Sequence, residues 1–159
     1  MNFTQKMCHY KAWANEKTFA ALQLVDPDEI YRNRHSCFSS ILSTLTHSYA
    51  IDDIFRAHLE GRVHRYEHKN VTSLTTLEEL RSKVNKMDRW WIGYAGQLNE
   101  TKEDELVEYT FLDGSKGAMT RQEMVIHQFN NSTYQRAYID KKLYSIHDIP
   151  TTTAYPDNT

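Results

Sequence analysis

Apolar residues recur every three or four positions along four long stretches of the chain, and this spacing predicts amphipathic α-helices. The stretches cover roughly residues 2–24, 37–60, 76–98 and 120–140. Capping-box patterns begin the last two at Thr76–Glu79 and Thr120–Glu123, and Gly61 is placed to end the second. Four helices of this length predict an all-α fold, a four-helix bundle.

The first two predicted helices differ in how their apolar residues are arranged. In the first, one stripe is expected to face the core, and the helix should stop at Asp26-Pro27; the stripe is Phe3, Met7, Tyr10, Ala14, Ala21 and Leu24. In the second, Leu45 lies on one face and Ile51 and Ile54 lie near the opposite one. We therefore expect the second helix to be central in the bundle or to form a subunit contact.

A different pattern separates the third and fourth predicted helices. Residues 105–118 alternate apolar and polar side chains and then turn at Asp113-Gly114, so a short hairpin or extended excursion is expected there. The end of the chain shows little periodicity. These patterns predict one four-helix-bundle domain over residues 1–145 and an irregular C-terminal tail over residues 146–159.

Composition narrows the functional classes. The 159 residues suffice for one core, and the net charge of -2, from 19 basic and 21 acidic residues, does not give the positive field of a nucleic-acid binder. No apolar run approaches the ~20 residues needed to cross a bilayer, and MNFTQKMCHY is not a secretory leader. Two cysteines, Cys8 and Cys37, cannot build a multi-bridge framework. A cytoplasmic protein without nucleic-acid or membrane partners is expected.

Polar residues on the predicted helices supply the candidate chemistry. His127, Asn131 and Gln135 lie one turn apart on a single stripe of the fourth helix. Asp52 falls on an apolar stripe of the second helix, and a buried carboxylate needs a partner, for which we expect an Arg or Tyr of the first helix. A structural bond is favoured over catalysis for Asp52.

Three segments carry a resemblance to a known family: YKAWANEK (10–17), ILSTLTHSYAIDDIFRAHLEG (41–61) and HQFNNSTYQRAYI (127–139). In order and spacing, over nearly the whole chain, they resemble the DinB-like, or damage-inducible, bundle family of bacterial proteins. The resemblance implies a four-helix bundle, often a homodimer, that binds a divalent metal such as zinc or nickel through one His of the second helix and two of the fourth. Family members include thiol S-transferases and related metal-dependent enzymes, and many have no assigned activity.

The implied metal site is altered in this sequence. The ligand of the second helix corresponds to His47, but the family pattern NHxTxHRG is replaced in the fourth helix, where Asn131 and Gln135 stand at the two His positions and Ala137 at the Gly. Zinc and nickel favour imidazole and thiolate, whereas amide oxygen is a harder donor that suits calcium or magnesium. The site is therefore predicted to be degenerate, with the metal absent or weakly bound and enzymatic activity uncertain.

Three interpretations of this altered site are open. In the favoured one, Asn131 and Gln135 hydrogen-bond to His47 and to each other, and the retained pocket binds a small molecule without metal. In the second, His127 joins His47, with Glu123 or water completing the site of a metal-dependent thiol S-transferase or hydrolase. In the third, the pocket or the dimer face of an interaction bundle is the whole function.

Two further groups of residues are assigned to ordinary roles. The basic, histidine-rich run from Arg56 to Lys69 could serve a phosphate, but solvated side chains that complement a helix C-terminus are the favoured interpretation. Trp13, Trp90 and Trp91 are expected to pack within the bundle or at a dimer contact.

Overall fold

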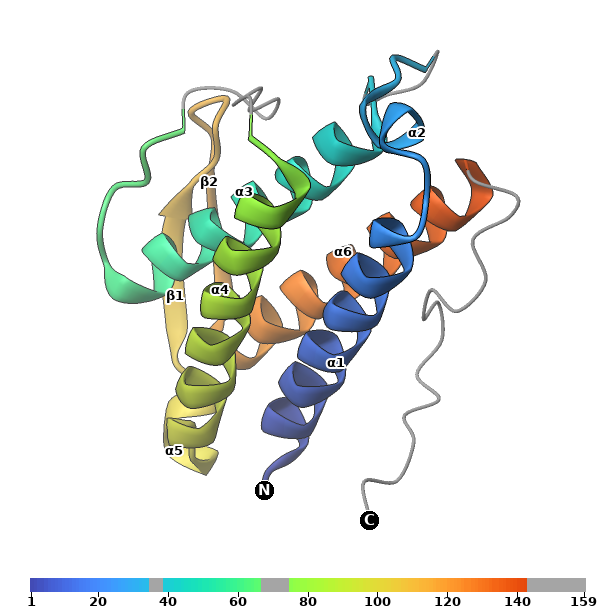
Figure 1. The fold of residues 1–159 in the computed structure, drawn as a ribbon. Helices are drawn as coiled ribbons and strands as arrows, with labels where there is room; N and C mark the ends of the chain where they lie inside the picture. The colour runs from blue at the N-terminus through green and yellow to red at the C-terminus, as the bar shows by residue number, and fades with distance from the viewer. Residues whose placement is uncertain (35–38, 67–74, 143–159) are drawn as a thin grey trace.

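The structure is a computed structural model that describes residues 1–34, 39–66 and 75–142, with the side chains of 140–142 left out (Figure 1). Four long helices form a bundle: α1 (Phe3–Gln23), α3 (Ile41–Glu60), α4 (Leu77–Gln97) and α6 (Arg121–Lys142). Two short helices, α2 (Pro27–Tyr31) and α5 (Glu100–Glu103), lie in the connections. The predicted all-α bundle is confirmed, and the predicted tail over residues 146–159 lies outside the described residues.

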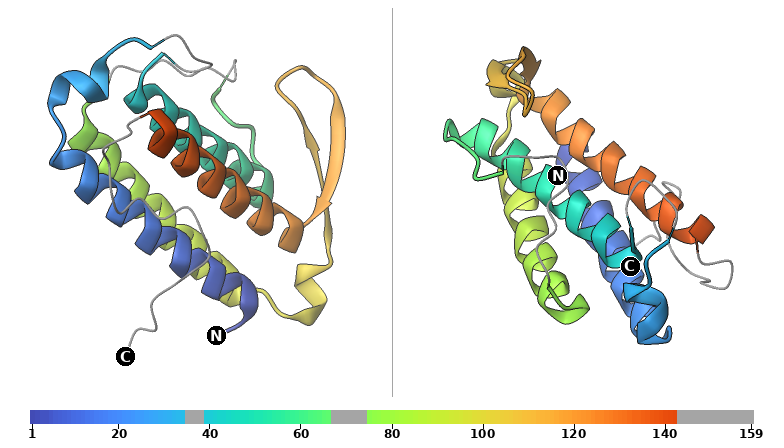
Figure 2. Two further views of the ribbon diagram at one scale, coloured as in Figure 1. Left: turned by 90° about the vertical axis from the view of Figure 1, so that its right-hand side faces the viewer. Right: turned by 90° about the horizontal axis from the view of Figure 1, so that it is seen from above.

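The helices pack as two adjacent pairs. Figure 2 shows α1 beside α4 and α3 beside α6, and α1 also contacts α6 while α3 contacts α4. The predicted hairpin is present between α5 and α6, where β1 (Leu106–Thr110) pairs antiparallel with β2 (Lys116–Thr120). Its turn contains Gly114 with a φ of 86°. Among the described residues, no helix has the length and apolar character needed to cross a membrane.

Local signals set the helix ends. Both capping boxes form, because the backbone amide of Glu79 donates to the Thr76 hydroxyl and the amide of Glu123 donates to the Thr120 hydroxyl, each at 3.1 Å. Gly61 ends α3 in the left-handed conformation with a φ of 69°. Asp26-Pro27 ends the first helical segment as expected, but it also begins α2, because the Asp26 carboxylate accepts the Asp28 amide and Pro27 occupies the first turn.

The predicted core face of the first helix is partly wrong. Phe3 and Leu24 are 64% and 91% exposed, whereas Thr4, Lys11 and Thr18 are buried. The spacing of apolar residues does not reveal buried polar side chains, because burial of a polar group depends on a partner elsewhere in the fold. The two ends of the apolar stripe accordingly lie in solvent.

The described core has three apolar clusters, and a polar layer lies between the two largest. One cluster contains Phe19, Leu45 and Val84, and the other contains Cys8, Phe55 and Trp91. The side chains of Lys11, Asp52 and Asp88 come between these positions on α1, α3 and α4, and all three are buried. Trp91 is fully buried, in agreement with its assignment to packing.

Candidate functional site

The candidate site residues lie on two neighbouring helices that meet along a seam, His47 on α3 and His127, Asn131 and Gln135 on α6. The guanidinium of Arg121 donates to the Leu59 carbonyl at 3.3 Å, so the start of α6 lies beside the end of α3 and the two helices are antiparallel. His47 precedes Leu59 by twelve residues, or about 18 Å of helix. The same rise along α6 from Arg121 ends between Asn131 and Gln135. The fold therefore brings His47 level with both amides.

The two amides of this seam have unsatisfied atoms. Gln135 is 5% exposed and Asn131 is half-buried. Within the described parts of the chain, Nδ2 of Asn131 and Oε1 of Gln135 are buried without a hydrogen-bond partner. The expected bonds from the amides to His47 and to each other are therefore not made through these two atoms. An unsatisfied buried polar atom costs roughly 1–3 kcal/mol, which marks this place as one that a polar molecule would complete.

The donor set does not fit a tightly held transition metal. Residues 1–34, 39–66 and 75–139 contain no group of three or more His, Cys, Asp or Glu side chains that could hold an ion. The positions that the family resemblance implies as ligands carry one imidazole and two neutral carboxamides, and one of the unpaired amide atoms is a nitrogen that can only donate. Zinc and nickel sites rest on imidazole, thiolate or carboxylate instead.

His127 lies elsewhere on the seam. Its ring packs against the ring of Phe55, with centroids 4.5 Å apart, and Phe55 follows His47 by eight residues, or about 12 Å along α3. Glu123 accepts the Thr120 amide at 2.8 Å as part of a helix cap. His127 therefore lies about two helical turns from the level of His47, and the Glu123 carboxylate is engaged in the cap of α6.

Beneath the seam, a buried polar network joins the four long helices. The Lys11 ammonium donates to Asp52 and, at 3.1 Å, to Asp88, and the side chains of all three are at most 5% exposed. Asn15 donates to the other oxygen of Asp88 at 2.9 Å, and Arg136 donates to Asn15 at 3.1 Å. Each helix contributes at least one member of this polar network.

The network explains why the Asp52 carboxylate can be buried in the core. The expectation that Asp52 is buried and paired with the first helix is confirmed, but the partner is Lys11 and not an Arg or Tyr. Sequence reasoning missed Lys11 because lysine is ordinarily a surface residue. A signal was present, since Cys8, Lys11, Asn15 and Phe19 keep the three-four spacing of a buried face.

Burial sets the protonation of this network. Burial raises the pKa of Asp52 to about 6, and Oδ1 of Asp52 has no partner among the described residues. Burial alone would lower the pKa of Lys11, but the Asp52 and Asp88 carboxylates raise it above its ordinary value. Burial also raises the pKa of Cys8 to about 12, so its thiol stays protonated at neutral pH and is a poor nucleophile. The network is suited to holding helices together.

Comparison with known protein families identifies a match. A sequence model described as the DinB family matches residues 1–140, which is most of the chain. The curated protein sequences contain no significant match.

The paired charges predict an asymmetric response to mutation. Lys11→Met leaves two carboxylates facing each other in the core and should lower the free energy of unfolding by about 3–5 kcal/mol. The triple variant K11M/D52L/D88L removes the whole charge set and should recover most of that loss. Urea denaturation measures both. Lys6→Met, at an exposed position of α1, is the matched control and should change stability by no more than ~0.5 kcal/mol. An equal loss in the single and triple variants would contradict the paired-charge account.

The raised pKa of Asp52 predicts a pH-dependent stability. Its carboxyl titrates near pH 6 when folded, against an ordinary value of 3.8, so the folded state binds more protons between these values. The contribution of Asp52 therefore lowers stability as pH rises from 3.8 to about 6. Asp52→Asn removes this titration, so the stability of the variant minus that of the wild type should increase with pH across the window. Denaturation curves at several pH values test this, and a difference that stays constant or decreases would refute it.

The donor set also predicts the metal content. Protein purified without a histidine tag and dialysed should carry far less than one zinc or nickel ion per chain, whereas N131H/Q135H, which restores the family pattern, should hold about one. Elemental analysis gives the ratio. The control N130H/Y134H adds the same two imidazoles at exposed positions one turn apart, so it should resemble the wild type. A stoichiometric, tightly held zinc or nickel ion in the wild type would contradict the conclusion that this donor set does not fit a transition metal.

Proposed function

Because this chain belongs to the DinB family, we propose that its site at His47, Asn131 and Gln135 binds a small polar molecule and has lost the tight divalent-metal binding of its relatives. The observation that carries the proposal is the pair of buried amide atoms without partners, Nδ2 of Asn131 and Oε1 of Gln135. If these amides only filled the space of a lost metal, we would expect their buried atoms to hydrogen-bond to each other.

The two atoms define the kind of ligand. Asn131 offers a donor and Gln135 an acceptor, and the two residues lie one turn, or about 6 Å, apart along α6. A ligand that fits carries an acceptor and a donor at a similar separation. Both amides are neutral, so a neutral molecule such as an amide, a diol or a thiol in its uncharged form suits them better than an ion.

The rival function is a metal-dependent thiol S-transferase or hydrolase built on His47 and His127. The contact of His127 with Phe55, about 12 Å along α3 from His47, supports the metal-free proposal over this rival. Following the family resemblance, we also propose that the protein is a cytoplasmic homodimer. The exposed apolar side chains of Val63, Leu106 and Phe111, on the hairpin and the loop after α3, are compatible with a subunit contact.

A thermal-shift experiment on metal-free protein tests the proposal. Small amides, diols and thiols are titrated, and at least one class should raise the melting temperature of the wild type in a saturable way, because a ligand that prefers the native state stabilises it. The variant N131L/Q135L, which removes both unpaired atoms, should lose that response. N130L, at an exposed position of α6, is the control and should keep it. If no probe acts and Gln135→Leu alone raises stability by about 1–3 kcal/mol, the atoms are simply unsatisfied and the proposal is wrong.

A further inference from the structure

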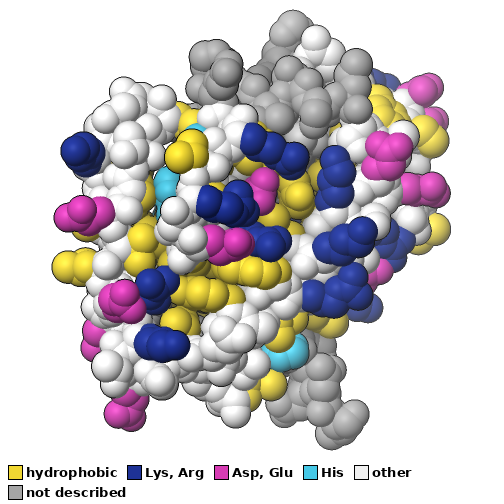
Figure 3. Space-filling model, turned by 90° about the vertical axis from the view of Figure 1, so that its left-hand side faces the viewer, with side chains coloured by type: hydrophobic (Ala, Val, Ile, Leu, Met, Phe, Trp, Pro, Cys, Tyr) yellow, Lys and Arg dark blue, Asp and Glu magenta, His cyan; other side chains and the backbone are white. Residues whose placement is uncertain are grey.

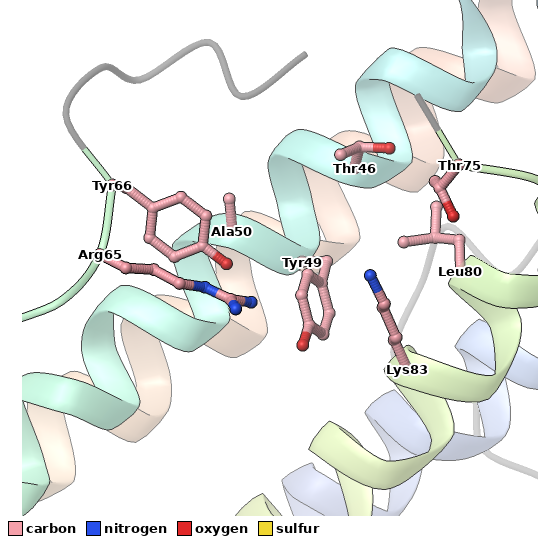
Figure 4. Close-up of a pocket in the computed structure, with 8 residues that line it drawn as sticks. All are labelled: Thr46, Tyr49, Ala50, Arg65, Tyr66, Thr75, Leu80 and Lys83. Carbon is pink, nitrogen blue, oxygen red and sulfur yellow. The ribbon is translucent and has the colours of Figure 1, made fainter. Parts of the chain in front are cut away.

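A pocket lies between α3 and α4, away from the α3–α6 seam. Its volume is about 290 Å³, and Figure 4 shows side chains from three segments around it. The residues that matter here are Thr46 and Tyr49 of α3, Arg65 and Tyr66 of the following loop, and Leu80 and Lys83 of α4. Thr46 and His47 are neighbours in sequence, so they point about 100° apart on the helix. The pocket therefore opens on a different face of α3 from the family site.

Two cations flank this pocket. In Figure 4, Arg65 and Lys83 lie on opposite sides of Tyr49, one from the loop and one from α4. Lys83 makes no ion pair with any described residue. Its ammonium is thus available to an anion that enters from solvent.

The neighbouring carboxylates are already engaged. Asp53 accepts the Tyr66 hydroxyl at 2.8 Å and has Arg62 and Arg65 at 4.0 and 3.7 Å, so two guanidinium groups share one carboxylate. Glu79 accepts the hydroxyl of Thr75, at the edge of the pocket, at 2.9 Å, and it closes the cap of α4. Among the described residues, the two charged side chains that line the pocket, Arg65 and Lys83, are both cations. The side of the molecule that carries the hairpin and the loop after α3 shows several Lys and Arg side chains grouped together (Figure 3).

The remaining walls are aromatic and aliphatic. Tyr49 and Tyr66 present rings, and Leu80 adds an apolar side chain. The volume lies near the lower end of the roughly 300–1,000 Å³ typical of small-molecule sites, so only a small ligand fits. We propose that this pocket binds a small organic oxyanion, with its carboxylate or phosphate between Arg65 and Lys83 and a flat apolar body against the two tyrosines. Arg65 belongs to the basic run for which solvated surface was the favoured interpretation.

Calorimetric titration of the full chain at constant ionic strength tests this proposal. Benzoate and phenyl phosphate should bind saturably, and each should bind more tightly than its partner without a ring, acetate or inorganic phosphate, because the ring contacts the tyrosines. The tighter binder of benzoate and phenyl phosphate shows whether the pocket prefers a carboxylate or a phosphate group. Arg65→Gln and Lys83→Gln should each weaken binding by about tenfold, since each removes one charge-assisted contact.

Matched variants separate a site from a general positive field. Lys86→Gln removes an exposed charge of α4 outside the pocket lining and should leave affinity unchanged. N131L/Q135L should also bind the aromatic anions normally, which keeps this result independent of the function proposed for the α3–α6 seam. The proposal is overturned if neither aromatic anion binds saturably, if either pocket variant binds like the wild type, or if K83Q and K86Q weaken binding equally.

Discussion

The contact of one ammonium with two carboxylates holds this bundle in register. Lys11 of α1 reaches Asp52 of α3 and Asp88 of α4 in an interior where each of the three side chains is at most 5% exposed. An unpaired charge in that position costs several kcal/mol, so any slip of one helix along its neighbours is opposed by charge as well as by shape. Two apolar clusters lie on either side of this layer, and neither would specify the helix register as sharply with interchangeable aliphatic contacts alone.

Buried polar groups in this core differ in how completely they are hydrogen-bonded. The charged network is extended by Asn15 and Arg136 until most of its atoms have partners. On the same helix α6, Asn131 and Gln135 each have a buried atom without a hydrogen-bond partner among the described residues. The charged groups contact one another across the four helices, although Oδ1 of Asp52 also lacks a partner, and this pairing supports a structural role for the network. The two open amides are neutral and pair with no charge, which supports the binding role proposed for them. The contrast gives the seam its functional interest.

Helix α3 places the two candidate sites on separate surfaces. Its residues face α6 on one side and α4 on another, and both seams carry polar side chains. The first seam carries the neutral amides of Asn131 and Gln135, whereas the second carries Arg65 and Lys83 with aromatic walls. One helix supplies both sites, so a ligand at either would contact the same element that carries Asp52. The two proposed sites differ in charge and would therefore select different ligands.

The sequence by itself determined the features whose causes are local. The helix caps at Thr76 and Thr120, the stop at Gly61 and the turn at Gly114 rest on neighbouring residues, and each is found in the structure. The family was also predictable, because it depends on residue identities at fixed spacing. So was the need of Asp52 for a partner, since a carboxylate on an apolar stripe cannot be buried alone.

Only the tertiary structure decided which residues meet. Lys11 as the partner of Asp52, the exposure of Phe3 and Leu24, and the position of His127 on Phe55 all depend on how the helices are placed side by side. The pocket of Arg65 and Lys83 likewise joins segments that are distant in sequence. Spacing along one helix fixes the direction of a side chain relative to its own axis. The neighbour it finds there is set by packing against other helices, which no single segment encodes.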